Sequence, residues 1–151
     1  MISKISSIGL CGIEGFRVEI ETDVSLGLPA FDLVGLPDAA VKEAKERVRS
    51  AIKNTGYEFP ARPITVNLAP ADVRKEGSVF DLPVLLGILQ ATGQINIDFS
   101  GSVFAGELSL GGELRGVNGI LPAVIKACEL SFDRIFVPFT NMLEAGVVEG
   151  I

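Results

Sequence analysis

The 151 residues of this chain include no histidine, which limits the catalytic and metal-binding sites that it can form. Ser-His-Asp and Cys-His catalysis, and metal sites that use imidazole ligands, are therefore excluded within the chain. The two cysteines, Cys11 and Cys128, are far apart, and neither belongs to a paired-cysteine motif. Both have apolar neighbours, so we expect reduced thiols in the core of a cytoplasmic protein.

Carboxylates are the next candidates for a ligand site. Asp72, Glu76 and Asp81 fall in one stretch and could attract a cation, but their spacing matches no known cation-binding loop. Asp81 is better placed as the N-cap of a helix, and Glu107 and Glu113 lie elsewhere in the sequence. We therefore expect no metal site in this chain.

Glycine-rich segments were compared with the motifs that hold nucleotide phosphates. No segment has the form G-x-x-x-x-G-K-S/T, and the glycines between Gly111 and Gly116 do not form G-x-G-x-x-G. The sequence therefore predicts that this chain alone binds no ATP or other cofactor.

These residues would be positioned by a strand, a loop and a helix predicted over residues 64–89. Apolar and polar residues alternate from Ile64 to Leu68, as in a half-buried strand, which Pro70 ends. A charged loop follows from Ala71 to Phe80. The helix that begins near Asp81 is apolar on all sides, which is typical of a helix inside the protein.

The remaining elements complete one domain over residues 1–151. We predict a hairpin at 3–23, strands at 30–34, 103–110 and 134–138, and helices at 38–54, 119–130 and 141–145. Two Gly-Leu-Pro turns bracket the strand at 30–34. The fold class is mixed α/β (α+β), with helices packed in layers on a mixed sheet. No apolar run is long enough to span a membrane.

Four segments, taken in order, resemble a known family. They are LPAFDLVGLPDAAVKE (28–43), ITVNLAPAD (64–72), KEGSVFDLP (75–83) and GELSLGGELR (106–115). They look like the N-terminal domain of the YifB/ComM proteins, which are bacterial Mg-chelatase-like AAA ATPases. The resemblance covers essentially the whole chain and implies a fold of the Lon-protease type, followed by an AAA module that binds ATP and Mg²⁺.

The likeness to Lon raises the question of a Ser-Lys dyad, which needs no histidine. In the Lon signature an acidic residue, a glycine and any residue precede the nucleophilic serine. In the matching string Glu76-Gly77-Ser78-Val79, Val79 stands at the nucleophile position, and Leu121 stands at the lysine position. The nearest lysine downstream of that position is Lys126. Because a serine nucleophile needs a base within hydrogen-bonding distance, the resemblance implies that the dyad is lost and that the chain is not an enzyme.

The resemblance implies an accessory domain that serves ring assembly or DNA engagement in a motor associated with DNA branch migration and competence. Its partners would be its own AAA module, neighbouring protomers and, as an open candidate, DNA. Arg62, Arg74 and Lys75 border or lie in the charged loop and are the candidate contacts. The net charge of −6 argues against nonspecific DNA binding by the domain as a whole. A degenerate Lon-like serine peptidase and a purely structural oligomerisation domain remain as alternatives.

Overall fold

Residues 2–24 form the long hairpin that the sequence predicts. In the computed structural model, which describes residues 1–151, β1 (Ile2–Cys11) and β2 (Glu14–Val24) are antiparallel, and Ile2 lies opposite Asp23. Every second side chain of β2 from Val18 to Val24 is buried. This alternation gives the hairpin one face for the core and one face for solvent.

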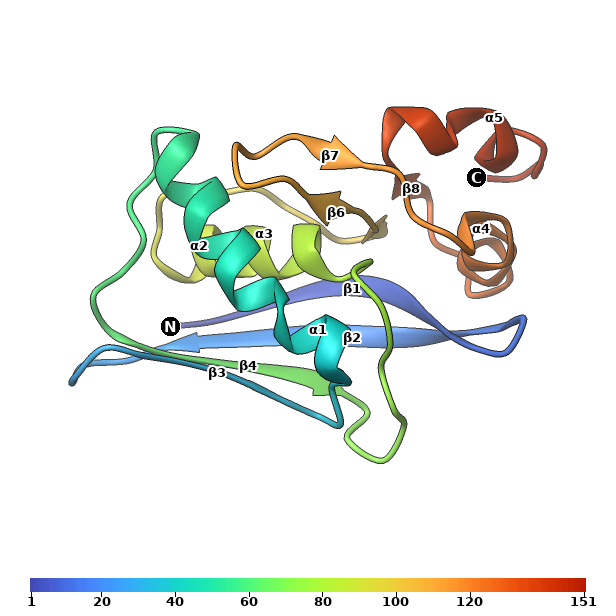
Figure 1. The fold of residues 1–151 in the computed structure, drawn as a ribbon. Helices are drawn as coiled ribbons and strands as arrows, with labels where there is room; N and C mark the ends of the chain where they lie inside the picture. The colour runs from blue at the N-terminus through green and yellow to red at the C-terminus, as the bar shows by residue number, and fades with distance from the viewer.

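The hairpin lies at the centre of a six-stranded mixed sheet with the order β3-β4-β2-β1-β5-β8 (Figure 1). β3 (Ala30–Val34) and β4 (Pro63–Ala69) are parallel neighbours, so a helical crossover must join them. The predicted helix at 38–54 makes this crossover, but it is interrupted at Glu43 into α1 (Ala39–Lys42) and α2 (Ala44–Asn54). The helix starts where predicted, and Asp38 caps it by accepting the Val41 N–H at 2.7 Å.

The core lies between the sheet and helices α2 and α3. α3 (Asp81–Ala91) packs against the central hairpin and buries most of its residues, as its apolar sequence predicts. In Figure 1, α2 and α3 lie on one face of the sheet, and neither covers the opposite face. That open face presents polar side chains, among them Lys4, Glu21, Thr65 and Asp32.

The predicted strand at 103–110 is wrong in one respect, because it forms two strands in different sheets. β5 (Ser102–Phe104) belongs to the main sheet, whereas β6 (Glu107–Leu108) pairs with β7 (Leu114–Arg115) in a separate ribbon. The break has a local cause. Gly106 donates its N–H to the Val79 carbonyl at 2.9 Å and accepts the Leu82 N–H at 3.1 Å, so here the chain bonds to the start of α3 rather than to the sheet.

The last third of the chain packs at the β1-β5-β8 end of the sheet. α4 (Ile120–Glu129) covers the hairpin, and β8 (Arg134–Phe136) pairs parallel to β5. The single-turn helices η1 (Phe139–Asn141) and α5 (Met142–Ala145) follow. No helix of this structure combines the length and apolarity needed to cross a membrane.

The two cysteines are not core residues. Cys11 is exposed at the end of β1, and Cys128 is partly exposed on α4. Both are free thiols, but their expected burial is wrong, because Cys11 is the last residue of β1 before the hairpin turn and Cys128 lies at the edge of the inward face of α4.

Candidate functional site

The loop between β4 and α3, which carries most of the candidate residues, is held down by a buried lysine. Lys75 is fully buried. Its Nζ donates to the carbonyl oxygens of Gly35, at 2.8 Å, and of Pro70. These carbonyls follow the ends of the parallel strands β3 and β4, so one ammonium group joins both strand ends.

The backbone of Lys75 adds to this anchor. Its N–H donates to the Leu36 carbonyl at 3.0 Å, and its carbonyl accepts the Asp38 N–H at 2.9 Å. The second Gly-Leu-Pro turn therefore pairs with this loop. Gly35 has a φ of +100°, and a Cβ at this position would lie 2.3 Å from the Leu68 oxygen. A glycine is thus required where this turn meets β4.

Burial sets the electrostatics of Lys75. Desolvation lowers the pKa of its ammonium group from the ordinary value of 10.5, and the nearby charge of Asp72 partly opposes this shift. The prediction that Lys75 is a surface contact for DNA or a partner is wrong, because no part of the residue reaches solvent. Charged residues in loops are usually solvated, and the sequence alone gave no sign that this one turns inward.

Asp81 at the start of α3 also differs from its predicted role. Its carboxylate caps no helix. Instead Oδ2 accepts Arg47 Nε at 2.6 Å and the Leu108 N–H at 3.0 Å, and Oδ1 accepts Arg47 Nη2 at 3.0 Å. Asp81 has no exposed surface, and the side chain of Arg47 is 18% exposed. This two-pronged ion pair joins α2, α3 and β6.

Each partner changes the acid–base behaviour of the other. Burial raises the pKa of the Asp81 carboxyl, while the bonds from Arg47 and from the Leu108 N–H oppose that rise. The hydrogen bond that Arg47 donates to Asp81 raises the pKa of Arg47, so the guanidinium stays charged. Arg47 also approaches Glu43, at 3.6 Å, but its main partner is Asp81.

A cleft of about 530 Å³ lies beside the loop before α3. Its walls include Ser78, Val79, Asn118, Gly119 and Ile120. The Ser78 hydroxyl donates to Glu107 Oε2 at 2.8 Å. This hydrogen bond places a hydroxyl next to a carboxylate beside the cleft, which is the arrangement of a nucleophile and a general base.

The structure separates the two positions assigned to the dyad. Val79 lines the cleft and packs against the core, whereas Leu121 is a partly buried residue of α4 that does not line it. The lysines near in sequence are bonded elsewhere: Lys75 to carbonyls, and Lys126 to Glu14 at 3.1 Å and Glu129 at 3.0 Å. Ser78 therefore has a carboxylate as its partner and not an amine.

The two arginines proposed as contacts do not form one patch. Arg62 precedes β4 and donates Nε to the Ser25 carbonyl at 3.0 Å, whereas Arg74 follows β4 and approaches Glu76 at 3.6 Å. A seven-residue strand separates them, which corresponds to roughly 20 Å. No group of three or more His, Cys, Asp or Glu side chains is arranged to hold a metal ion.

Comparisons with known proteins give consistent matches over this domain. A family model described as "Subunit ChlI of Mg-chelatase" matches residues 20–141. "Competence protein ComM" of Haemophilus influenzae is 46% identical over 138 residues, which are 91% of this chain and 27% of that protein. "Uncharacterized protein YifB" of Escherichia coli is 41% identical over 150 residues, which are 99% of this chain and 29% of that protein. An uncharacterized protein of Mycobacterium tuberculosis is 40% identical over 151 residues. The chain spans less than a third of the length of these relatives.

The Arg47–Asp81 pair predicts a strong coupling in a double-mutant cycle. We expect Arg47→Met and Asp81→Leu each to lower the free energy of unfolding by about 3–5 kcal/mol, because each leaves a buried charge without its partner. The double variant should lose less than the sum of the two by about 1–3 kcal/mol. Urea unfolding measures all four proteins. The control Glu43→Gln, at the exposed end of the network, should change stability by less than about 0.5 kcal/mol.

The lowered pKa of Lys75 predicts a pH dependence of stability. Below 10.5 but above the folded-state pKa, the unfolded chain binds more protons at this site than the folded chain. Stability therefore rises with pH in that window. The free energy of unfolding of the wild type minus that of Lys75→Met should increase as pH approaches 10.5, by at most about 1.4 kcal/mol per pH unit. Lys42→Met, which removes an exposed lysine of α1, controls for the loss of one charge, and an equal slope for it would contradict the assignment.

Proposed function

We propose, from the premise that this chain belongs to the Mg-chelatase ChlI-like family together with ComM and YifB, that it is a non-catalytic accessory domain of a longer ATPase. Its role is assembly with its own AAA module and with neighbouring protomers in a ring in the cytoplasm. ATP and Mg²⁺ are assigned to that module and not to this domain. The Lon-type ancestry of the fold is part of the same proposal.

The observation that carries the proposal is the match of nearly the whole chain to less than a third of each relative. Each relative therefore contains this domain together with a longer segment that the present chain does not match. We assign the domain a role that supports the activity of the longer protein. The name of ComM refers to competence, and a DNA-remodelling motor of the branch-migration type is the pathway that we assign to the longer protein.

Surface character supports protein contacts over DNA contacts. Phe139 and Leu143, on η1 and α5, are 81% and 86% exposed, and Leu26 and Leu28, before β3, are 88% and 87% exposed. Large apolar side chains in such positions are suited to burial against another protein surface. The open face of the sheet carries Glu19, Glu21 and Asp32, which repel phosphates.

A degenerate peptidase is the second candidate, and the bond between Ser78 and Glu107 is the observation that favours it. Glu107 accepts the hydroxyl proton in the right direction for a general base. However, the nearby Arg47 is engaged by Asp81 and is not free to stabilise an oxyanion, and the cleft side chains of Val79 and Ile120 are apolar.

Cleavage of an unfolded protein separates the two candidates. We expect the wild type and Ser78→Ala to cleave β-casein at the same negligible rate, because no activated nucleophile is assigned to the cleft. Fragments are followed by gel electrophoresis and mass spectrometry over a day, and circular dichroism checks the fold of both proteins. Cleavage by the wild type that Ser78→Ala abolishes would show an enzyme and reject the accessory role.

A DNA-binding assay decides between assembly and DNA engagement. We expect no saturable binding of a duplex or a four-way junction by this chain at about 50 mM salt, since its charge is negative and its candidate arginines lie apart. Fluorescence anisotropy measures the binding. Binding that weakens at about 200 mM salt, is lost in Arg62→Ala/Arg74→Ala and is kept in the control Arg115→Ala would instead assign DNA contact to these two arginines.

A further inference from the structure

The first half of β1 has one backbone edge without a neighbouring strand. Met1 and Val24 exchange both of their backbone hydrogen bonds, at 3.3 and 3.4 Å. Along antiparallel strands, hydrogen-bonded residue pairs alternate with pairs that are not hydrogen-bonded. Ser3 and Ile5 therefore also bond to β2, whereas the N–H and C=O groups of Ile2 and Lys4 point away from β2. On that far side β1 meets β5 only where Ser6 lies opposite Val103.

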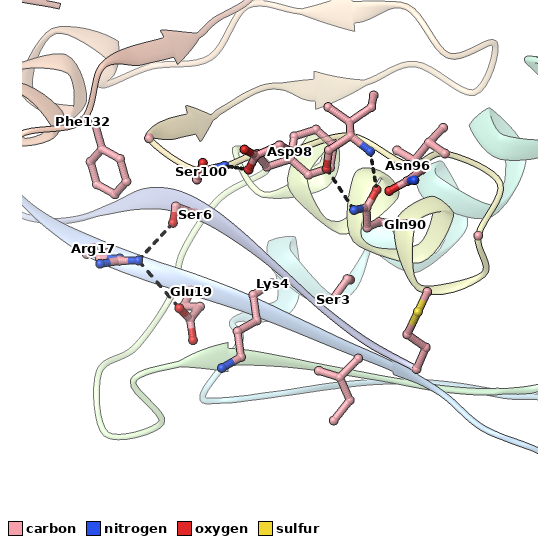
Figure 2. A pocket seen from close by; sticks show the side chains of 17 residues that line it. Ser3, Lys4, Ser6, Arg17, Glu19, Gln90, Asn96, Asp98, Ser100 and Phe132 are labelled. Atoms are coloured by element: carbon pink, nitrogen blue, oxygen red, sulfur yellow. Dashed lines mark hydrogen bonds and ion pairs between the residues drawn. The ribbon is translucent and has the colours of Figure 1, made fainter.

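A local bond explains why this edge stays open. The Ser102 N–H donates to the Phe99 carbonyl at 3.1 Å, which turns the chain out of the sheet just before β5 begins. The preceding residues therefore form a loop that faces β1 without pairing to it. The space between them is a cleft of about 920 Å³, whose walls include Ile2 and Ile97. Lys4 and Asp98 also line it (Figure 2).

The loop that forms the far wall is held by its own contacts. Gln90 on α3 donates to the Ile97 carbonyl at 3.0 Å and accepts the Ile97 N–H at 3.2 Å, as the dashed lines in Figure 2 show. Asp98 accepts the Ser100 N–H at 3.0 Å, and the ring of Phe99 packs edge-on against Phe104. The cleft is therefore formed before anything enters it, which lowers the entropy cost of binding.

The charges around the cleft select the occupant. Arg17 is already engaged, because it donates to Ser6 at 3.3 Å, lies 3.7 Å from Glu19 and stacks over Phe132. Lys4 is exposed and makes no ion pair or side-chain hydrogen bond. Glu21, its neighbour across the hairpin, accepts instead from Asn67 at 3.0 Å. Among the side-chain cations of the cleft wall, Lys4 is thus the one left for a ligand.

We propose that this cleft is a docking groove for an extended peptide segment that adds to β1 as a strand. The backbone of the segment bonds to the free N–H and C=O groups of Ile2 and Lys4. An acidic side chain of the segment pairs with the Lys4 ammonium. Addition of a strand to an open edge supplies affinity through the main chain, and the side-chain pair supplies selectivity. This inference does not depend on the proposed function.

Amide hydrogen exchange of the full chain tests the groove. The probes are two acetylated and amidated nonapeptides of alternating Thr and Val, one with a central Glu and one with a central Lys. We expect the Glu peptide at saturation to slow exchange of the Ile2 and Lys4 amides by about tenfold or more, because both gain a hydrogen bond. The Lys peptide should bind more weakly. Unchanged exchange of both amides at millimolar Glu peptide would overturn the proposal.

Variants at one position separate the backbone from the charge. Lys4→Pro removes an N–H that the domain itself does not use, so we expect it to fold and to lose binding of the Glu peptide, whereas Lys4→Ala should retain weakened binding. Lys4→Glu should reverse the preference between the two peptides, and the control Lys42→Glu on α1 should not. Equal affinity of the Glu peptide for Lys4→Pro and the wild type would exclude strand addition. NMR amide spectra confirm the fold of each variant.

Discussion

One buried charge constrains the arrangement of the domain. Asp81 has no contact with water, so its carboxylate depends on the guanidinium of Arg47 and on the Leu108 N–H. These partners come from a helix that precedes it by 34 residues and from a strand that follows it by 27. If either partner moved, a bare charge would remain in the core, at a cost of several kcal/mol. α2, α3 and β6 are therefore fixed relative to one another.

The loop between β4 and α3 is fixed at both of its ends by charges of opposite sign. Asp81 holds the end at α3, and Lys75 holds the other through carbonyls that follow β3 and β4. Between them, Ser78 bonds to Glu107 at the edge of the cleft. Lys75 and Asp81, which the sequence offered as a contact residue and a cation ligand, hold the loop in place through hydrogen bonds.

The surface of the domain has several features that are suited to binding other proteins. One face of the sheet is packed under α2 and α3 (Figure 1), and the other presents polar side chains such as Lys4, Glu21 and Asp32. Exposed apolar side chains gather at η1 and α5, and β1 has an open edge beside a preformed cleft. These features belong to different parts of the molecule, so a contact at one of them would leave the other accessible.

The sequence alone determined the parts of the fold that follow from local patterning. The hairpin, β4 and α3 follow from alternating or continuous apolar residues, and Asp38 caps its helix because that bond spans three residues. Family membership followed from blocks such as residues 75–83. Tertiary structure alone decided the roles of Lys75, Arg47 and Asp81. Their partners are distant in the chain, and a charged residue in a loop or on a helix has the same local pattern whether it faces water or a buried partner. The break after β5 and the open edge of β1 were likewise set by bonds to Val79 and Phe99, which no periodicity reveals.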